Sequence, residues 1–303
     1  MAKRRRYLED TCKTALNRVP EASRVPFRWT VNPYRGCTHS CHYCFARAFH
    51  TYLDLDIGDD FATRIVVKTN VAEVLRRELA SPKWEGEPVA MGTATDPYQH
   101  CEGRYRLTRA IVEAFADFEN PLSMLTKSTM IVRDLDLFTR LSRVADVTVS
   151  MSVGTLDEEV RRVVEPGTPP GAKRLEILAR FADAGIRTGV LVAPILPGLT
   201  DDDEHLDEVL EACARAGIAY ASPIVLHVRS SIRDYVMPWF QQAYPWLYPR
   251  YVELYGRRAY APKAYQQELS ERFARLRLRH GIGGGASRPV AKPAERGQLE
   301  LAV

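Results

Sequence analysis

Between residues 64 and 225, short apolar runs alternate with longer stretches in which apolar residues recur at helical spacing. Val71–Leu79 has the second pattern, because its apolar residues fall on one face of a helix. Lys173–Ala184 has it too, and Gly185 follows as a typical helix terminator. The other predicted helices are Thr108–Phe118, Arg133–Arg143 and Asp203–Ala216. The predicted strands are Trp29–Asn32, Arg64–Lys68, Pro88–Gly92, Leu122–Thr126, Val147–Met151, Arg187–Val192 and Tyr220–Val225.

Strands that alternate with helices predict an α/β protein with a parallel sheet of βα units. No strand is followed by a Gly-x-Gly-x-x-Gly turn, which argues against a dinucleotide-binding fold. The pattern is compatible with a barrel or a partial barrel, in which active sites lie at the carboxyl ends of the strands. Functional residues are therefore expected just after the predicted strands.

Both ends of the chain differ from this central pattern. Residues 1–24 are polar and basic, with a short helical pattern near Leu8–Leu16, and residues 25–230 hold the predicted core. Aromatic residues become dense in 231–282, where we expect packing against the core more than stacking with bases. That extension includes a charged helix, Ala264–His280. The Gly- and Pro-rich tail, residues 283–303, is expected to be disordered.

Composition narrows the class further. The chain has 303 residues, is 46% hydrophobic and carries a net charge of +4. This mild basicity permits a nucleic-acid partner without requiring one. No apolar run reaches the roughly 18 residues of a membrane span. The basic run Lys3–Arg6 is not followed by the apolar segment of a secretion signal, so we expect a cytoplasmic protein.

Three cysteines in one short segment carry the strongest chemical signal. Cys37, Cys41 and Cys44 form a C-x3-C-x2-C pattern with an aromatic residue, Tyr43, before the last cysteine. Soft thiolates suit iron–sulfur clusters, and three of them would occupy three corners of a [4Fe–4S] cube. The fourth iron would then have no protein ligand and would be open to a small molecule.

A structural zinc site is the main alternative for these cysteines. His39, His42 or His100 could complete a Cys3His set, although zinc sites usually draw their ligands from two separate pairs. A disulfide framework fits less well, because the chain has only six cysteines and no secretion signal. Cys12 and Cys213 are interpreted as structural.

Polar residues follow several of the predicted strands. Thr93 and Thr95 come after Pro88–Gly92, and Lys127 comes after the next strand. Ser150 and Ser152 alternate on a later strand, so both side chains point to one face of the sheet. A lysine at a strand end can bind a carboxylate as a compact charge with three donors. These positions are therefore candidates for binding a ligand at the carboxyl edge of the sheet.

Three motifs resemble the radical S-adenosylmethionine (SAM) superfamily, in its spore photoproduct lyase-like branch. They are Asn32–Cys37, Cys41–Arg47 and Gly92–Gln99, and they are similar in particular to a bacterial group typified by Rv2578c. The resemblance implies a partial (β/α)6 TIM-like barrel with a helical C-terminal extension. It also implies a [4Fe–4S] cluster held by the three cysteines, and an electron donor such as flavodoxin or ferredoxin.

In that family the open iron chelates the amino and carboxylate groups of SAM, and one electron cleaves SAM to a 5′-deoxyadenosyl radical that abstracts hydrogen from a substrate. The resemblance implies that Thr93 and Thr95 contact the amino group and that Lys127 pairs with the carboxylate. It implies ribose or carboxylate contacts for Ser150 and Ser152, and places Phe45 and the Ala193–Gly198 segment near the adenine.

One departure limits what the resemblance implies about the substrate. Spore photoproduct lyases carry a hydrogen-donating cysteine in the segment that matches Gly92–Asp96, and this chain has none there. Cys101 is a candidate for a similar catalytic role, and a packing role is equally compatible. Nearby, Glu102, Arg104 and Arg109 could contact substrate or brace the loop. Three functions stay open: a radical SAM enzyme of unknown substrate, a lyase-like enzyme that repairs a nucleic-acid lesion, and a zinc-stabilised binding module.

Overall fold

A computed structural model describes residues 5–23 and 25–284 of the chain. Its main feature is an eight-stranded sheet with the order β11-β10-β9-β8-β7-β6-β3-β2. Apart from the two-residue edge strand β11, six neighbouring strands run parallel and confirm the predicted parallel sheet. They are β3 (Trp29–Val31), β6 (Val89–Met91), β7 (Leu122–Thr126), β8 (Val147–Ser152), β9 (Arg187–Ile195) and β10 (Tyr220–Val225). Antiparallel β2 (Leu16–Arg18) and parallel β11 (Gly283–Gly284) form the two edges.

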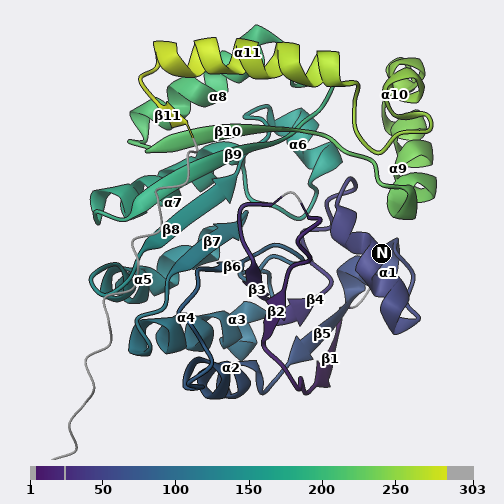
Figure 1. Cartoon of the computed structure of the whole chain (residues 1–303). Helices are drawn as coiled ribbons and strands as arrows, with labels where there is room; N and C mark the ends of the chain where they lie inside the picture. Colours follow the sequence, from purple (N-terminus) through teal and green to yellow (C-terminus); the bar gives the residue numbers. More distant parts are fainter. Residues whose placement is uncertain (1–4, 24, 285–303) are drawn as a thin grey trace, which may run out of the picture.

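Helices cover the outer face of this sheet, as Figure 1 shows. They are α2 (Val71–Leu79), α4 (Leu107–Asp117), α5 (Leu135–Ser142), α7 (Gly171–Asp183), α8 (Asp203–Arg215) and α11 (Lys263–Arg279). Their buried residues, such as Ile111 and Phe115 of α4, face the strands and form the main core. Within residues 5–23 and 25–284, no helix is both long and apolar enough to cross a membrane.

A second, three-stranded sheet lies beside the N-terminal part of the main one. Its order is β1 (Arg6–Asp10), β5 (Arg64–Lys68) and β4 (Tyr34–Arg35). The predicted helix near Leu8–Leu16 is therefore wrong, because Leu8 pairs with Val66 across parallel strands. The predicted strand Arg64–Lys68 is confirmed, but it belongs to this small sheet and not to the series of βα units. Pairing with a distant segment outweighs a weak local helical pattern.

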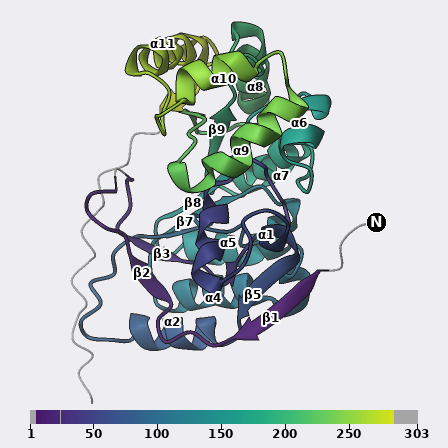
Figure 2. The same cartoon turned by 90° about the vertical axis from the view of Figure 1, so that its right-hand side faces the viewer.

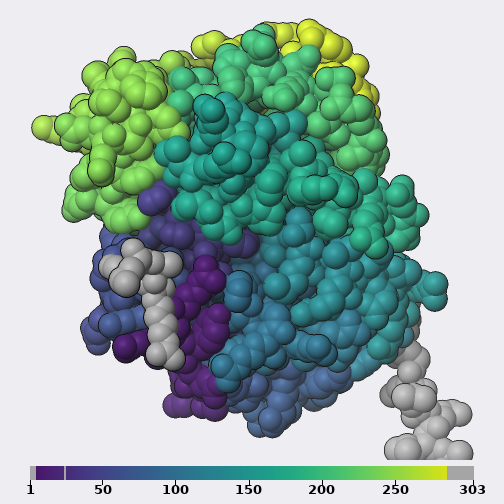
Figure 3. Space-filling view, turned by 180° about the vertical axis from the view of Figure 1, so that it is seen from behind, coloured from purple at the N-terminus to yellow at the C-terminus, as the bar shows by residue number. Residues whose placement is uncertain are grey.

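The aromatic extension forms a core of its own. It contains α9 (Ser230–Ala243) and α10 (Tyr248–Tyr255), which lie beside the later βα units in Figures 2 and 3. The rings of Phe240 and Tyr251 are 4.1 Å apart, and both are fully buried. Most of these aromatics pack as predicted, whereas Trp246 and Tyr260 are 70% and 52% exposed.

Several elements escaped the sequence patterns, and all of them except η1 are too brief to show a period. They are η1 (Phe45–Leu53), α1 (Asp59–Thr63), α3 (Glu102–Tyr105), η2 (Thr129–Asp134) and α6 (Glu158–Val164). The predicted helix Arg133–Arg143 begins as η2 and continues as α5. Of the predicted disordered tail, Gly283 and Gly284 pair with β10, and residues 285–303 lie outside the described part.

Gly92 generates a testable prediction for stability. It ends β6 with a φ of +92°, and a Cβ there would lie 1.8 Å from the carbonyl oxygen of Leu125. Gly92→Ala should therefore lower the free energy of unfolding by about 3 kcal/mol, measured by urea denaturation. Gly185 is the matched control, because its φ is +76° but nothing lies within 4 Å of a Cβ. Gly185→Ala should cost only about 1 kcal/mol, and equal losses in both variants would contradict the predicted clash.

Candidate functional site

The cysteine segment forms a loop after β3 and β4, at the carboxyl edge of the parallel sheet. Cys37 and Cys41 are 8% and 7% exposed, Cys44 is half-buried, and all three are free thiols. The Cys37 amide donates a hydrogen bond to the Phe61 carbonyl at 2.9 Å. Gly36 has a φ of +81°, and a Cβ there would lie 2.9 Å from the same Phe61 carbonyl. Only glycine lets the chain turn into the loop at this point.

Burial raises the pKa of each of the three thiols. The pKa of Cys41 rises to about 12, mainly through burial and next through the negative charge of Glu165. In the protein without a metal centre, the three groups are thus protonated at neutral pH. Iron binds thiolates, so loading would release protons and would place the charge of the cluster in a nearly dry loop. Three soft donors on one loop, two of them buried and the third half-buried, fit an iron–sulfur cluster, whose cysteines each bind a different iron.

The positions of the three candidate histidines do not favour the zinc alternative. His39 Nδ1 is 3.2 Å from a carboxylate oxygen of Asp96, His42 stacks on Trp239 with ring centroids 4.5 Å apart, and His100 is exposed. In the described part of the chain, no three His, Cys, Asp or Glu side chains, the three cysteines included, gather closely enough to hold a single metal ion, so this finding does not separate zinc from a cluster. Nothing in this geometry favours a Cys3His zinc site.

Arg47 holds the cysteine loop in place through hydrogen bonds to backbone carbonyls. Its side chain is fully buried, and its Nε donates to the Cys41 carbonyl at 3.0 Å. The other guanidinium nitrogens donate to the carbonyls of Ser40 at 3.0 Å, and of Ile57 and Gly58 at 2.8 Å each. The planar fork of arginine suits several acceptors at once. Sequence reasoning recognised Arg47 only as part of a motif and missed this role.

Asp96 joins the cysteine loop to the end of β7. Its carboxylate accepts hydrogen bonds from the Thr126 hydroxyl and the Lys127 amide, at 2.7 Å each, and from the Tyr98 amide at 2.9 Å. His39 of the cysteine loop completes the set. Burial alone would raise the pKa of Asp96, but His39 and these donors lower it to about 2. The carboxylate is therefore ionised.

The loop after β6 also contacts the cysteine loop directly. The carbonyl of Gly36 accepts hydrogen bonds from Thr95 Oγ1 at 2.5 Å and from Gln99 Nε2 at 2.9 Å. Gln99 Oε1 in turn accepts from the Thr38 amide at 3.0 Å. The hydroxyl of Thr95, a predicted SAM contact, is thus bonded within the protein. Thr93 is half-buried at the same strand end.

Lys127 and the two serines lie at adjoining strand ends. Lys127 Nζ donates to Ser152 Oγ at 2.6 Å, and Ser152 Oγ donates to the Ala193 carbonyl of β9 at 2.7 Å. The Ser150 hydroxyl is 2.7 Å from the Tyr220 hydroxyl of β10. The sheet therefore brings predicted residues from β7 and β8 together with β9, and Ser150 lies next to β10.

A buried ionic cluster adjoins Lys127 and was missed by sequence reasoning. Glu165, just after α6, is 4% exposed and accepts from Arg174 of α7 at 2.6 Å and from Thr168 at 3.1 Å. The Tyr43 hydroxyl also donates to it, and Lys127 Nζ lies 3.7 Å away. Burial would raise the pKa of Glu165, but Arg174 and Lys127 hold it at about 2. No sequence pattern links residues so far apart.

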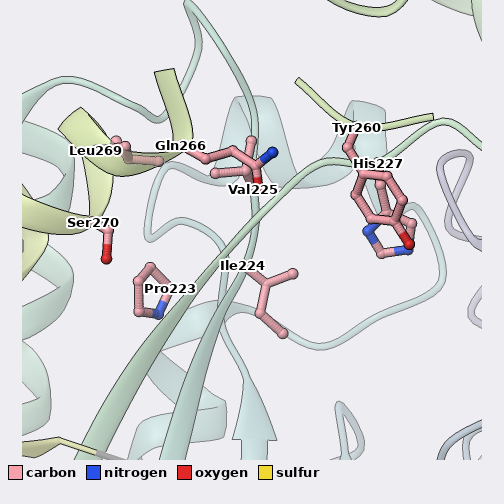
Figure 4. Close-up of a pocket in the computed structure, with 8 residues that line it drawn as sticks. All are labelled: Pro223, Ile224, Val225, His227, Tyr260, Gln266, Leu269 and Ser270. Carbon is pink, nitrogen blue, oxygen red and sulfur yellow. The ribbon is translucent and has the colours of Figure 1, made fainter. Parts of the chain in front are cut away.

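Phe45 points from the cysteine loop toward the extension. Its ring is 6.0 Å from that of His227 and 5.3 Å from the guanidinium carbon of Arg229. A pocket of about 250 Å³ begins at His227 and Tyr260 and continues between β10 and α11, with Val225 among its lining residues (Figure 4). The predicted adenine contact at Phe45 thus lies beside this pocket.

Cys101 lies within the main core. It is 1% exposed, and burial followed by the negative charge of Glu102 raises the pKa of its thiol to about 12. Tyr34 is a hydrogen-bonding neighbour of the thiol and also donates to Glu102. A thiol in this position packs the core, so the geometry gives no support to the predicted catalytic role.

Glu102 and Arg109 brace the same region. Glu102 is fully buried and accepts from Arg133 at 2.9 Å and from the Thr108 amide at 3.0 Å. Arg109 donates to the buried carboxylate of Asp134 at 2.9 Å. Arg104 is exposed on the surface. Of the two options that the sequence left open for Glu102 and Arg109, bracing fits these contacts.

The family follows from the comparisons with known proteins. The model of the radical SAM superfamily matches residues 31–213, more than half of the 303 residues. The chain therefore belongs to the radical SAM superfamily, which confirms the resemblance seen in its motifs.

Among its relatives is the uncharacterized protein Rv2578c of Mycobacterium tuberculosis, which is 49% identical over 92% of this chain and 82% of its own length. The radical SAM Nalpha-GlyT isomerase of Pseudomonas phage M6 is 27% identical over 59% of this chain and 36% of that protein. A spore photoproduct lyase mutant with bound AdoMet and dinucleoside spore photoproduct has a TM-score of 0.64 at 16% identity, covering 92% of this chain and 80% of that chain. At this identity the likeness shows a shared fold.

The ionised state of Asp96 generates a prediction for acid stability. Folding lowers its pKa from 3.8 to about 2, so its ionised form stabilises the fold above about pH 4, and that stabilisation is lost as pH falls toward 2. Asp96→Asn should remove on the order of 2 kcal/mol of this pH-dependent unfolding free energy. Urea denaturation at about pH 6 and about pH 2.5 measures the difference. Asp183→Asn, at an exposed residue of α7, should retain the wild-type pH dependence, and an unchanged slope in Asp96→Asn would refute the role of this carboxylate.

Proposed function

We propose that Cys37, Cys41 and Cys44 hold a [4Fe–4S] cluster and that the protein reductively cleaves SAM to abstract hydrogen from a substrate. When bound, the cluster would supply the electron for cleavage, which the protein would receive from a donor such as flavodoxin or ferredoxin. The observation that carries the proposal is the position of three free thiols, two buried and one half-buried, on one loop at the carboxyl edge of a parallel sheet.

The polar strand ends support a SAM site beside this loop. The Lys127 ammonium is held at the end of β7, where it can pair with the SAM carboxylate. Thr93 is a candidate for the amino group, because the Thr95 hydroxyl already serves the Gly36 carbonyl. Ser150 is a candidate ribose contact, and Phe45 would border the adenine.

The fold supports the same proposal. Without the two-residue edge strand β11, the neighbouring parallel strands number six, as expected for an incomplete (β/α)6 barrel, and we propose that they form one. Their carboxyl ends would then surround a single site. The proposal does not name the substrate, because all residues with assigned roles would contact SAM. The segment Gly92–Asp96 contains no cysteine, so thymine-dimer reversal is not part of the proposal.

SAM cleavage tests the proposal. The anaerobically reconstituted, dithionite-reduced protein should convert SAM to 5′-deoxyadenosine, and a Cys37/Cys41/Cys44 triple alanine variant should lose both the brown colour and this product. Lys127→Ala should keep the cluster and raise the KM for SAM at least about tenfold, because a charged hydrogen bond is lost. Product is measured by chromatography, and iron by chemical assay.

Lys173→Ala is the control for this experiment, since Lys173 is an exposed lysine that pairs with Glu176 on α7. It should behave as wild type. A colourless protein that binds one zinc ion, or an intact cluster without SAM cleavage, would overturn the proposed function.

A further inference from the structure

Lys127 has three ammonium N–H donors, and one of them donates a hydrogen bond to Ser152 Oγ at 2.6 Å. The ammonium also forms an ion pair with Glu165 Oε1 at 3.7 Å, which is longer than a hydrogen bond. Lys127 itself is partly buried, with its side chain 17% exposed. Donor capacity is therefore left for an incoming acceptor, and the contacts with Ser152 and Glu165 set the direction in which the ammonium points.

Glu165 cannot swing away from this position. Both of its carboxylate oxygens are bonded, one to Arg174 and Thr168 and the other to the Tyr43 hydroxyl. Its own segment is fixed to the cysteine loop on both sides. The amide of His42 donates to the Val164 carbonyl at 3.1 Å, and the Gly167 amide donates to the His39 carbonyl at 3.0 Å.

The charges in this cluster do not cancel. Lys127 and Arg174 contribute two positive charges and Glu165 one negative charge, and Glu165 and Arg174 are almost fully buried. Buried ion pairs rarely stabilise a fold more than well-packed apolar residues would. A buried cluster with one excess positive charge at a strand end is arranged to receive an anionic group.

We propose that Glu165 is a positioning residue that orients the Lys127 ammonium toward the carboxylate of SAM. This inference rests on the proposed function, because it takes SAM as the ligand. Glu165 acts through Lys127 and does not touch the ligand. Its bond with Tyr43 fixes the position of the lysine relative to the cysteine loop.

The test is SAM binding to the reconstituted protein, measured by isothermal titration calorimetry without reductant. Glu165→Gln keeps the side-chain volume and should raise the Kd for SAM about tenfold. If Glu165 acted only through its charge, its removal would leave more positive charge and would lower the Kd. If Glu165 were only structural, thermal stability would fall and the Kd would not change. Either of these results overturns the proposal.

Two further measurements separate positioning from general damage. The compound 5′-methylthioadenosine lacks the amino acid part of SAM, so Glu165→Gln should leave its Kd unchanged. In the double variant with Lys127→Ala, Glu165→Gln should add nothing to the loss caused by Lys127→Ala, since residues that act through one another are not additive. Additive losses, or equal weakening of both ligands, would contradict the proposal.

Two matched variants control for the loss of a negative charge and for a failure to fold. Glu159→Gln removes the same charge from an exposed position on α6 and should bind SAM as wild type does. If Glu165→Gln does not fold, Glu165→Asp retains the charge for Arg174 but draws the carboxylate away from Lys127, and the same rise in Kd is expected. Wild-type protein that holds a cluster but binds no SAM would refute the proposed function, whereas wild-type binding with no coupling between the two residues would refute this inference alone.

Discussion

The buried carboxylate of Asp96 is the interaction on which the arrangement of the site depends. An ionised group in a protein interior is tolerated only when hydrogen bonds and charges replace its water. For Asp96 these come from its own turn, from the end of β7 and from His39 in the cysteine loop. Satisfying one buried charge therefore fixes the distance between the cysteine loop and Lys127, whose amide is among the donors.

Two other buried charged residues, Arg47 and Glu165, link segments around Asp96 in the same way. Arg47 donates hydrogen bonds to carbonyls of the cysteine loop. Glu165 accepts a hydrogen bond from Tyr43 of that loop and forms an ion pair with Lys127. These contacts join segments that are distant in sequence but adjacent at one edge of the sheet. Buried networks of this kind hold a geometry because each missing bond is costly. Cysteines that bind one cluster, as we propose for Cys37, Cys41 and Cys44, need such rigidity more than they need extra stability.

Local patterns predicted much of the architecture. The strands Leu122–Thr126 and Tyr220–Val225 and the helix Val71–Leu79 have the predicted bounds, because the pattern of apolar residues is a local property. The helix expected near Leu8–Leu16 failed because β1 gains its hydrogen bonds from β5, more than 50 positions away. The strand Arg64–Lys68 was predicted correctly, but it lies in the small sheet. A local strand pattern does not show which other strand it will pair with.

The sequence by itself indicated the class of protein, because three thiols at fixed short spacing must share one loop whatever the fold around them. It also determined which residues follow the strands of a parallel sheet, and so which could meet at one edge. Only the tertiary structure decided how those residues are used. It gave the Thr95 hydroxyl to a backbone carbonyl, placed Cys101 in the core, and paired Lys127 with Glu165. Burial and long-range hydrogen bonding assign such roles, and neither can be read from neighbouring positions in the chain.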